Sequence, residues 1–204
     1  MEAKKFLLAL DSKKIKYGLT RTKQLLRACG NPQLDIFSIQ VIGTNGKGST
    51  AAMLAHTLIA NNYKVGLYTS PHLVSINERV KINHQQIHTQ AMNQFLKTYK
   101  SEILKIQPSF FEILTVMAIT YFKENNTEFV ILETGLGGKY DSVTATKAQI
   151  VVFTSISLDH MHILGENISK IAQEKAGAIS EHTKLIVSDN QTTKVLKVLN
   201  KQAK

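Results

Sequence analysis

Short runs of hydrophobic residues alternate along this chain with longer segments in which hydrophobic residues recur every three or four positions. Apolar runs bounded by polar or glycine-rich segments are typical of strands buried in a parallel sheet, and the longer segments are typical of the helices that cover it. The pattern therefore predicts an α/β fold, a mostly parallel sheet with helices on both faces. The expected strands are residues 37–42, 64–68, 129–132, 150–154 and 185–187.

Expected helices fill the segments between these runs. The helix after Pro108 has the clearest start signal, because Ser109 followed three residues later by Glu112 forms a capping-box pattern. The helix nearest the N-terminus is expected to stop at Gly30. Helices are predicted over residues 19–29, 51–60, 89–100, from 109 onward, 168–178 and 192–202.

Composition narrows the class of protein. The 204 residues are 43% hydrophobic and 20% charged, with 3 prolines, which is typical of one globular domain or two small ones and excludes collagen-like and disordered classes. The single cysteine, Cys29, excludes an internal disulfide and favours a reducing compartment. We expect Cys29 to be a small buried apolar residue near a helix end.

No segment of the sequence predicts contact with a membrane. The apolar segment 6–10 is shorter than the ~7 to 15 residues of a signal peptide's apolar region. Segment 110–122 contains Glu112 and is shorter than the ~18 residues that a membrane span needs. We therefore expect a cytoplasmic protein.

The formal net charge of +10 raises the question of a nucleic-acid partner. Among the 25 basic residues, however, only Arg21, Arg27 and Arg79 are arginines, and the lysines are scattered along the chain. Proteins that read bases favour arginine-rich or aromatic-interleaved stripes, and none is present. We expect no nucleic-acid partner, and a diffuse positive field that attracts small anionic substrates.

A glycine-rich turn containing Lys47 lies between an expected strand and an expected helix. In this arrangement backbone N–H groups surround phosphates and the lysine neutralises their charge. Val41 stands where the usual pattern has its first glycine, and Gly48 stands where it has a magnesium-binding hydroxyl. That hydroxyl could be shifted to Ser49 or Thr50, or come from another loop; the alternative is a plain turn with a solvated lysine. The predicted phosphate-binding residues are Gly43, Thr44, Asn45, Gly46, Lys47, Gly48, Ser49 and Thr50.

Two further polar clusters follow expected strands. Ser70, followed by Pro71 and His72, could supply the hydroxyl that is missing at Gly48, although the same residues suit a plain turn. Glu133 ends an apolar run and precedes the glycines of segment 135–138, which could let a substrate approach the backbone. A carboxylate at a strand end resembles the magnesium-holding element of nucleotide hydrolases, and we favour this role over that of a helix cap or a solvated side chain.

A last cluster follows the expected strand 150–154. His160 is a candidate metal ligand because it follows a strand end, whereas a lone histidine is more often structural. Lys175, on the next expected helix, taken alone would be a surface charge. We expect structural roles for the other histidines considered, which are His56, His84, His88, His162 and His182.

Together these motifs resemble the folylpolyglutamate synthase and dihydrofolate synthase family, a branch of the ATP-dependent Mur-type amide ligases. The resemblance implies a P-loop sheet of the type found in the central domain of Mur ligases. The motifs that carry it, in order over nearly the whole chain, are Tyr17-Gly18-Leu19, Gly30-Asn31-Pro32-Gln33, 43–49, 69–73, Asn77-Glu78-Arg79, Phe111-Glu112, 133–138, Leu158-Asp159-His160 and 174–177.

The resemblance implies ligation through an acyl phosphate. ATP phosphorylates a carboxylate of folate or dihydropteroate, and the amine of L-glutamate then attacks to give an amide, ADP and phosphate. By motif, Lys47 is implied to bind the ATP phosphates. Ser70 and Glu133 are implied to hold one Mg²⁺, and Glu133 and His160 a second.

The resemblance also implies that Lys175 is carbamylated, which turns a cation into a carboxylate-like group. The family usually has a Thr-Asn pair where this chain has Val143-Thr144. The residues expected to recognise the pterin ring of the substrate therefore differ here. The implied substrate-binding residues are Pro71, His72, Arg79, Phe111 and Asp141.

Family members are roughly twice as long as this chain. We therefore expect residues 1–204 to be an ATP-binding domain that is incomplete at its C-terminal end. We expect a monomer that is complemented by a second α/β domain. An alternative from another class is a non-catalytic nucleotide-binding module derived from such a ligase. A third, a nucleic-acid-stimulated ATPase, would need a basic stripe that the sequence lacks.

Overall fold

A computed structural model describes residues 6–7 and 18–204 of the chain. In this part of the protein one sheet has the order β4-β3-β2-β5-β1-β6-β7. The pairs from β2 through β5, β1 and β6 to β7 are parallel, and the β2–β3 and β3–β4 pairs are antiparallel. The strands are β1 Ser38–Ile42, β2 Val65–Tyr68, β3 Val80–Ile82, β4 Gln85–Gln86, β5 Phe129–Glu133, β6 Ile150–Phe153 and β7 Leu185–Ser188.

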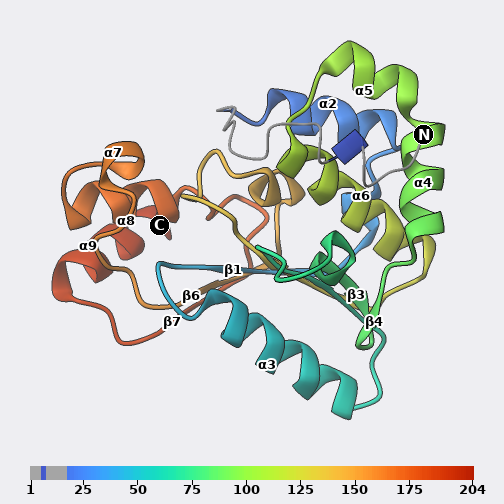
Figure 1. Cartoon of the computed structure of the whole chain (residues 1–204). Coiled ribbons are helices and arrows are strands. Elements are labelled where there is room, and N and C mark those ends of the chain that lie inside the picture. Colours follow the sequence, from blue (N-terminus) through green and yellow to red (C-terminus); the bar gives the residue numbers. More distant parts are fainter. Residues whose placement is uncertain (1–5, 8–17) are drawn as a thin grey trace.

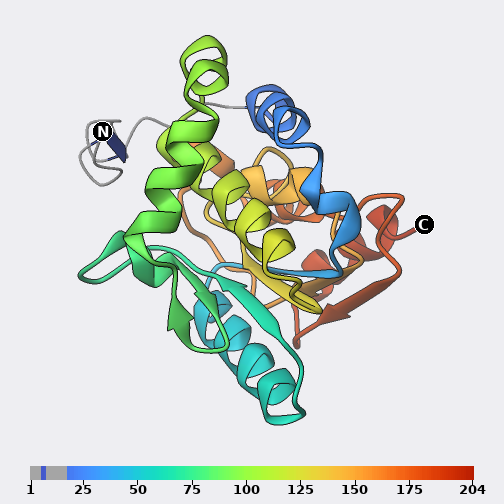
Figure 2. The same cartoon turned by 90° about the vertical axis from the view of Figure 1, so that its right-hand side faces the viewer.

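Helices cover both faces of this sheet (Figure 1). On one face, α3 packs on alternate side chains of β1 and β5, such as Val41 and Ile131. On the other face, α6 covers the β2 and β5 side and lies between α4 and α2 (Figure 2), while α8 and α9 cover β6. The helices are α2 Thr20–Ala28, α3 Lys47–Ala60, α4 Thr89–Thr98, α5 Lys100–Ile106, α6 Phe110–Glu124, α7 Met161–Leu164, α8 Ile168–Ala176 and α9 Thr193–Gln202, with 3-10 turns η1 Pro32–Asp35, η2 Ile76–Arg79 and η3 Ser142–Thr146.

The predicted α/β class and all five predicted strands are confirmed, with ends shifted by a residue or so. The helix predicted from residue 51 begins earlier, at Lys47, so the phosphate-loop lysine is already helical. The helix predicted over 89–100 is instead two helices that meet at Tyr99. Tyr17 and residues 8–10, which were used in the predictions, lie outside the described residues.

The β3–β4 hairpin was not predicted. Its two strands are short, and its turn residues Asn83 and His84 have φ of 43° and 71°. These are the left-handed values that a two-residue hairpin turn needs, but the usual sequence signal for them is Asn-Gly rather than Asn-His. The hairpin therefore extends the sheet beyond β2 without a strong local signature.

Two local predictions are confirmed. Ser109 caps α6: its Oγ accepts from the Glu112 N–H at 3.3 Å, and Glu112 Oε2 accepts from the Ser109 N–H at 2.6 Å. Cys29 is the C-cap of α2 and packs partly buried against the core, and burial raises the pKa of its thiol to about 11. No helix within residues 6–7 and 18–204 is both long and apolar enough to cross a membrane.

Gly66 in β2 lies close against Phe122 of α6. A Cβ added there would lie 2.7 Å from the buried ring of Phe122. We expect Gly66→Ala to lower the free energy of unfolding by about 1 to 3 kcal/mol, because the ring has no room to move without repacking. Urea unfolding measures this change. The same substitution should cost less in a Phe122→Leu background, and an equal cost in both backgrounds would contradict the packing explanation.

Candidate functional site

The turn after β1 is built as an anion site. Gly46 is the N-cap of α3 with φ of 80°, a left-handed conformation that glycine adopts without strain. No side chain caps this helix, so its first N–H groups and the positive end of its dipole face the turn. Lys47 Nζ donates to the Thr44 carbonyl at 2.9 Å, which holds the ammonium against the loop. The arrangement is the one that binds phosphate groups.

The loop after β6 fixes the turn in place. The Thr44 N–H donates to the Ser155 carbonyl at 2.8 Å, and the Ser157 N–H donates to Thr44 Oγ1 at 3.1 Å. Gly43 is needed at the contact, because a Cβ there would lie 1.9 Å from Thr154 Oγ1. The two strand-end loops therefore form one unit. No sequence pattern indicates the contact between Thr154 and Gly43.

Glu133 at the end of β5 faces the first turn of α3. Its Oε2 accepts from the Ser70 N–H at 2.8 Å, and a Cβ at Gly48 would lie 3.3 Å from Oε1. Burial raises the pKa of Glu133, while the Ser70 N–H and the charges of Lys47 and Arg79 oppose this shift. The structure thus brings four predicted residues, Lys47, Gly48, Ser70 and Glu133, to one edge of the sheet.

This edge suits a hard cation. The Glu133 carboxylate and the hydroxyl of Ser70 are oxygen donors, and Mg²⁺ is usually held by one or two carboxylates together with waters and substrate phosphates. The described residues contain no cluster of three or more His, Cys, Asp or Glu side chains that could hold a metal ion by themselves. The donor set therefore fits a magnesium ion that is shared with a phosphate ligand.

His160 lies further along this edge, at the N-cap of α7. Its side chain is half exposed, its Nε2 is 3.6 Å from the Asp159 carboxylate, and its ring is 6.3 Å from that of His162. These contacts involve residues of its own loop rather than Glu133. A role for His160 at a second metal ion stays a prediction.

Lys175 is not the surface charge that its sequence context alone would indicate. It lies on α8, is only 4% exposed, and its Nζ donates to the Gly43 carbonyl at 2.7 Å. Burial lowers the pKa of Lys175 to about 8, and the charge of Lys47 acts in the same direction. A buried lysine therefore joins α8 directly to the phosphate loop.

The glycines after Glu133 have a packing role. A Cβ at Gly135 would lie 2.7 Å from the Phe111 ring, and one at Gly138 would lie 2.7 Å from the backbone of Lys175. The two glycines therefore let α6 and α8 approach the β5 loop. Gly138 is buried but Gly135 is exposed, so the expectation that these glycines let a substrate approach the backbone stays a prediction.

Arg79 and His72 form a pair beside this edge. Arg79 is buried, its Nε donates to His72 Nδ1 at 2.8 Å, and its guanidinium lies 5.3 Å from the centre of the Phe110 ring. Burial and the neighbouring Arg79 lower the pKa of His72. Pro71, which follows Ser70 through a cis peptide bond, is exposed. The pair therefore presents a neutral imidazole held by a buried cation.

The Asp141 carboxylate forms its hydrogen bonds within its own loop. Its carboxylate accepts from the N–H groups of Gly135, Leu136 and Val143 at 2.9 to 3.0 Å. Burial raises its pKa to about 6, and these three donors oppose the shift. Both carboxylate oxygens are thus occupied by backbone, and contact of Asp141 with a substrate stays a prediction.

A cavity of about 420 Å³ opens on the other flank of the phosphate loop. It lies between the loop and the ends of β6 and β7, which leaves room for the rest of a nucleotide whose phosphates sit in the turn. The residues that line it include Asn45, Gly46, Thr50, Phe153, Ser155 and Asp189.

Comparison with known proteins agrees with this geometry. Residues 41–204 match the family described as Mur ligase middle domain. The chain belongs to the Mur ligase middle-domain family. A dihydrofolate synthase/folylpolyglutamate synthase of Bacillus subtilis is 39% identical to this member over 196 residues, which are 93% of this chain and 45% of that protein.

Two solved structures show the same fold in proteins of this kind. A Mycobacterium tuberculosis folylpolyglutamate synthase in complex with ADP is 32% identical, with a TM-score of 0.88 over 98% of this chain and 47% of that one. An FPGS–AMPPCP–folate complex is 31% identical, with a TM-score of 0.90 over 98% of this chain and 50% of that one. The resemblance found from the motifs is confirmed, and the chain spans about half the length of the relatives that it matches.

The buried Lys175 ammonium should make stability depend on pH. The charged ammonium is disfavoured in the folded state, so its burial lowers the free energy of unfolding. This destabilisation is fully present below pH 8 and fades as the pH rises from about 8 toward the ordinary lysine pKa of 10.5. Relative to Lys175→Met, the unsubstituted protein should gain on the order of 3 kcal/mol across that window. Urea unfolding at several pH values measures the difference. The exposed Lys139→Met is the control, and parallel curves for all three proteins would contradict a buried charge.

Proposed function

We propose that this protein takes part in the ATP-dependent ligation of L-glutamate to folate or dihydropteroate. The observation that carries the proposal is the edge where Lys47, Gly48, Ser70 and Glu133 meet, because it combines a phosphate turn with an oxygen donor for Mg²⁺. The relatives described as bound to ADP, AMPPCP and folate support the same ligands here. We also propose a cytoplasmic location, where a lone cysteine is kept reduced.

ATP is the proposed phosphate donor. Its phosphates occupy the turn 43–50, with the first N–H groups of α3 and the Lys47 ammonium against their charge. Phosphoryl transfer to a substrate carboxylate brings two anions together, so it needs positive charge held at fixed positions. Mg²⁺, once bound, neutralises phosphate charge, and Glu133 and Ser70 are the residues proposed to hold it. His160 is proposed as a ligand of a second ion.

The second half-reaction joins glutamate to the activated carboxylate. The amine nitrogen attacks the acyl phosphate carbon and the C–N bond forms. Phosphate leaves with the electron pair of the broken C–O bond, and the nitrogen releases a proton to phosphate or water. The relatives that the chain matches are about twice its length. We propose that the chain acts as a monomer and that a second α/β domain completes the site, so that the amine reaches the acyl phosphate before water does.

Lys175 is the proposed site of carbamylation. The reaction with carbon dioxide needs the neutral amine, and the lowered pKa of about 8 makes the neutral fraction larger than that of an ordinary lysine. A carbamate would replace a cation beside Gly43 by an oxygen-rich anion. That group would suit a site that contains Mg²⁺.

The substrate side is proposed to lie on the α6 side of the β2 and β5 ends. Pro71, His72, Arg79, Phe111 and Asp141 are the proposed contacts, with the Phe111 ring offering a flat apolar surface to a pteridine. Comparing ADP release with dihydropteroate and with folate, each with and without glutamate, distinguishes the two carboxylate substrates.

Removal of the Lys47 charge should abolish nucleotide binding. We expect Lys47→Ala to lower the affinity for a fluorescent ATP analogue by about 100-fold or more, because the ammonium lies against the phosphate turn. The exposed Lys97→Ala, on α4, is the matched control and should bind normally. Unchanged affinity in a folded Lys47→Ala protein would contradict the proposed phosphate site.

Loss of the Glu133 charge should affect Mg²⁺-dependent nucleotide binding more than the stability of the protein. Glu133→Gln keeps the size of the side chain but removes its charge, so it should weaken the Mg²⁺-dependent part of nucleotide binding about tenfold or more. Glu128→Gln is a matched control, because Glu128 is also a glutamate of the β5 segment whose carboxylate accepts a backbone N–H at 2.8 Å. Thermal unfolding of both variants completes the test, and a loss of stability without a change in Mg²⁺ dependence would favour a structural role.

A further inference from the structure

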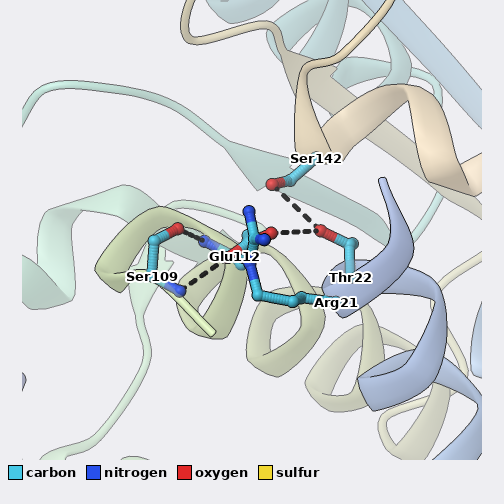
Figure 3. A network of polar contacts seen from close by, with 5 residues as sticks. All are labelled: Arg21, Thr22, Ser109, Glu112 and Ser142. Carbon is cyan, nitrogen blue, oxygen red and sulfur yellow. Dashed lines mark hydrogen bonds and ion pairs between the residues drawn. The ribbon is translucent and has the colours of Figure 1, made fainter. Parts of the chain in front are cut away.

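A buried carboxylate, that of Glu112, joins three elements of the fold (Figure 3). Its Oε2 accepts from Arg21 Nε at 3.1 Å and from the Ser109 N–H at 2.6 Å. The Thr22 hydroxyl lies 3.5 Å from Oε1 and 3.2 Å from the Ser142 hydroxyl. Helix α2 and the first turn of α6 therefore meet at the Glu112 side chain, and Thr22 connects it to the turn η3.

This network exceeds what a helix cap requires. A capping box needs only the exchange between Ser109 and Glu112, which a solvated glutamate performs equally well. Here the Glu112 side chain is 4% exposed, and a buried carboxylate is costly unless a cation and hydrogen-bond donors compensate it. Arg21 supplies the cation from a helix 91 residues away in sequence. The network thus fixes the start of α6 relative to α2 and η3.

The first turn of α6 and the turn η3 contact or adjoin the proposed substrate residues. Phe110 lies under the guanidinium of Arg79. The Phe111 ring lies against Gly135 and 5.9 Å from the ring of Tyr68. On the η3 side, Ser142 directly follows Asp141, whose carboxylate organises the loop after β5. A displacement of the start of α6 would therefore move Phe111 and Arg79 together.

We propose that Glu112, held by Arg21, is a positioning residue for the pteridine end of the substrate. It touches neither substrate nor nucleotide, and acts by setting where Phe111 and Arg79 stand. This inference rests on the proposed function. It adds to that function two residues, Arg21 and Glu112, whose effect is on folate and not on ATP, because the network lies on the α6 face and the phosphate turn is the start of α3.

The test uses Glu112→Gln and, at the partly exposed end of the pair, Arg21→Met. Each should weaken the binding of folate, followed by its fluorescence, by about tenfold, the size expected for loss of a charge-assisted hydrogen bond. The affinity for a fluorescent ATP analogue should stay within about twofold. Arg21→Lys, which keeps the positive charge, should recover part of the folate affinity.

Lys123→Met is the matched control, because it breaks another ion pair of the same helix, Lys123–Asp35 at 3.0 Å, at the opposite end of α6. It should leave both affinities unchanged. Equal weakening of folate and nucleotide binding by Arg21→Met, or a loss of thermal stability alone, would overturn the positioning role and leave a structural one.

The variant Phe111→Ala separates this inference from the proposed function. If Phe111→Ala loses folate binding while Arg21→Met and Glu112→Gln do not, the substrate site stands and the positioning role is overturned. If the unsubstituted protein binds the ATP analogue but not folate, the proposed substrate class and this inference are both overturned. Weak folate binding in all three variants, with nucleotide binding intact, supports the inference.

Discussion

The site depends on one constraint, the parallel pairing of β1 with β5 on one side and β6 on the other. Val41 is paired with Glu133, and Ile42 with Phe153, so three strands end at nearly the same level. The polar groups that follow them have to share a small volume at the carboxyl edge of the sheet. A shift of one residue in the β1–β5 pairing would turn the Glu133 side chain to the opposite face, away from its present position against α3.

Within that volume the structure concentrates positive charge before any ligand is present. Lys175 is buried against the Gly43 carbonyl, and the charge of Lys47 helps to lower its pKa. Two lysines and an uncapped helix start are disfavoured by mutual repulsion and become favourable once an anion is bound. The fold therefore tolerates a local electrostatic cost at the phosphate turn, which is common at functional sites.

Features that are local in sequence could be predicted, and those that arise from packing could not. The apolar runs gave the strands, and Ser109 with Glu112 gave the start of α6, because each signal lies within a few neighbouring residues. The burial of Lys175 depends on where α8 packs against the phosphate loop, and the residues next to Lys175 in sequence do not indicate this position. The link from Arg21 to Glu112 spans 91 residues, so a sequence shows only the capping half of it.

Gly48 shows how one small residue affects both the phosphate turn and the carboxylate at the end of β5. The usual phosphate turn has a hydroxyl at this position, but here a side chain would begin 3.3 Å from the Glu133 carboxylate. The glycine lets β5 bring that carboxylate close to the first turn of α3, and the Ser70 N–H then holds it from the β2 side. An oxygen donor is thus supplied by the sheet and a neighbouring loop in place of the helix. The residue after Lys47 and the carboxylate at the end of β5 consequently constrain one another, since a larger residue at 48 would have to displace the group proposed to hold the metal.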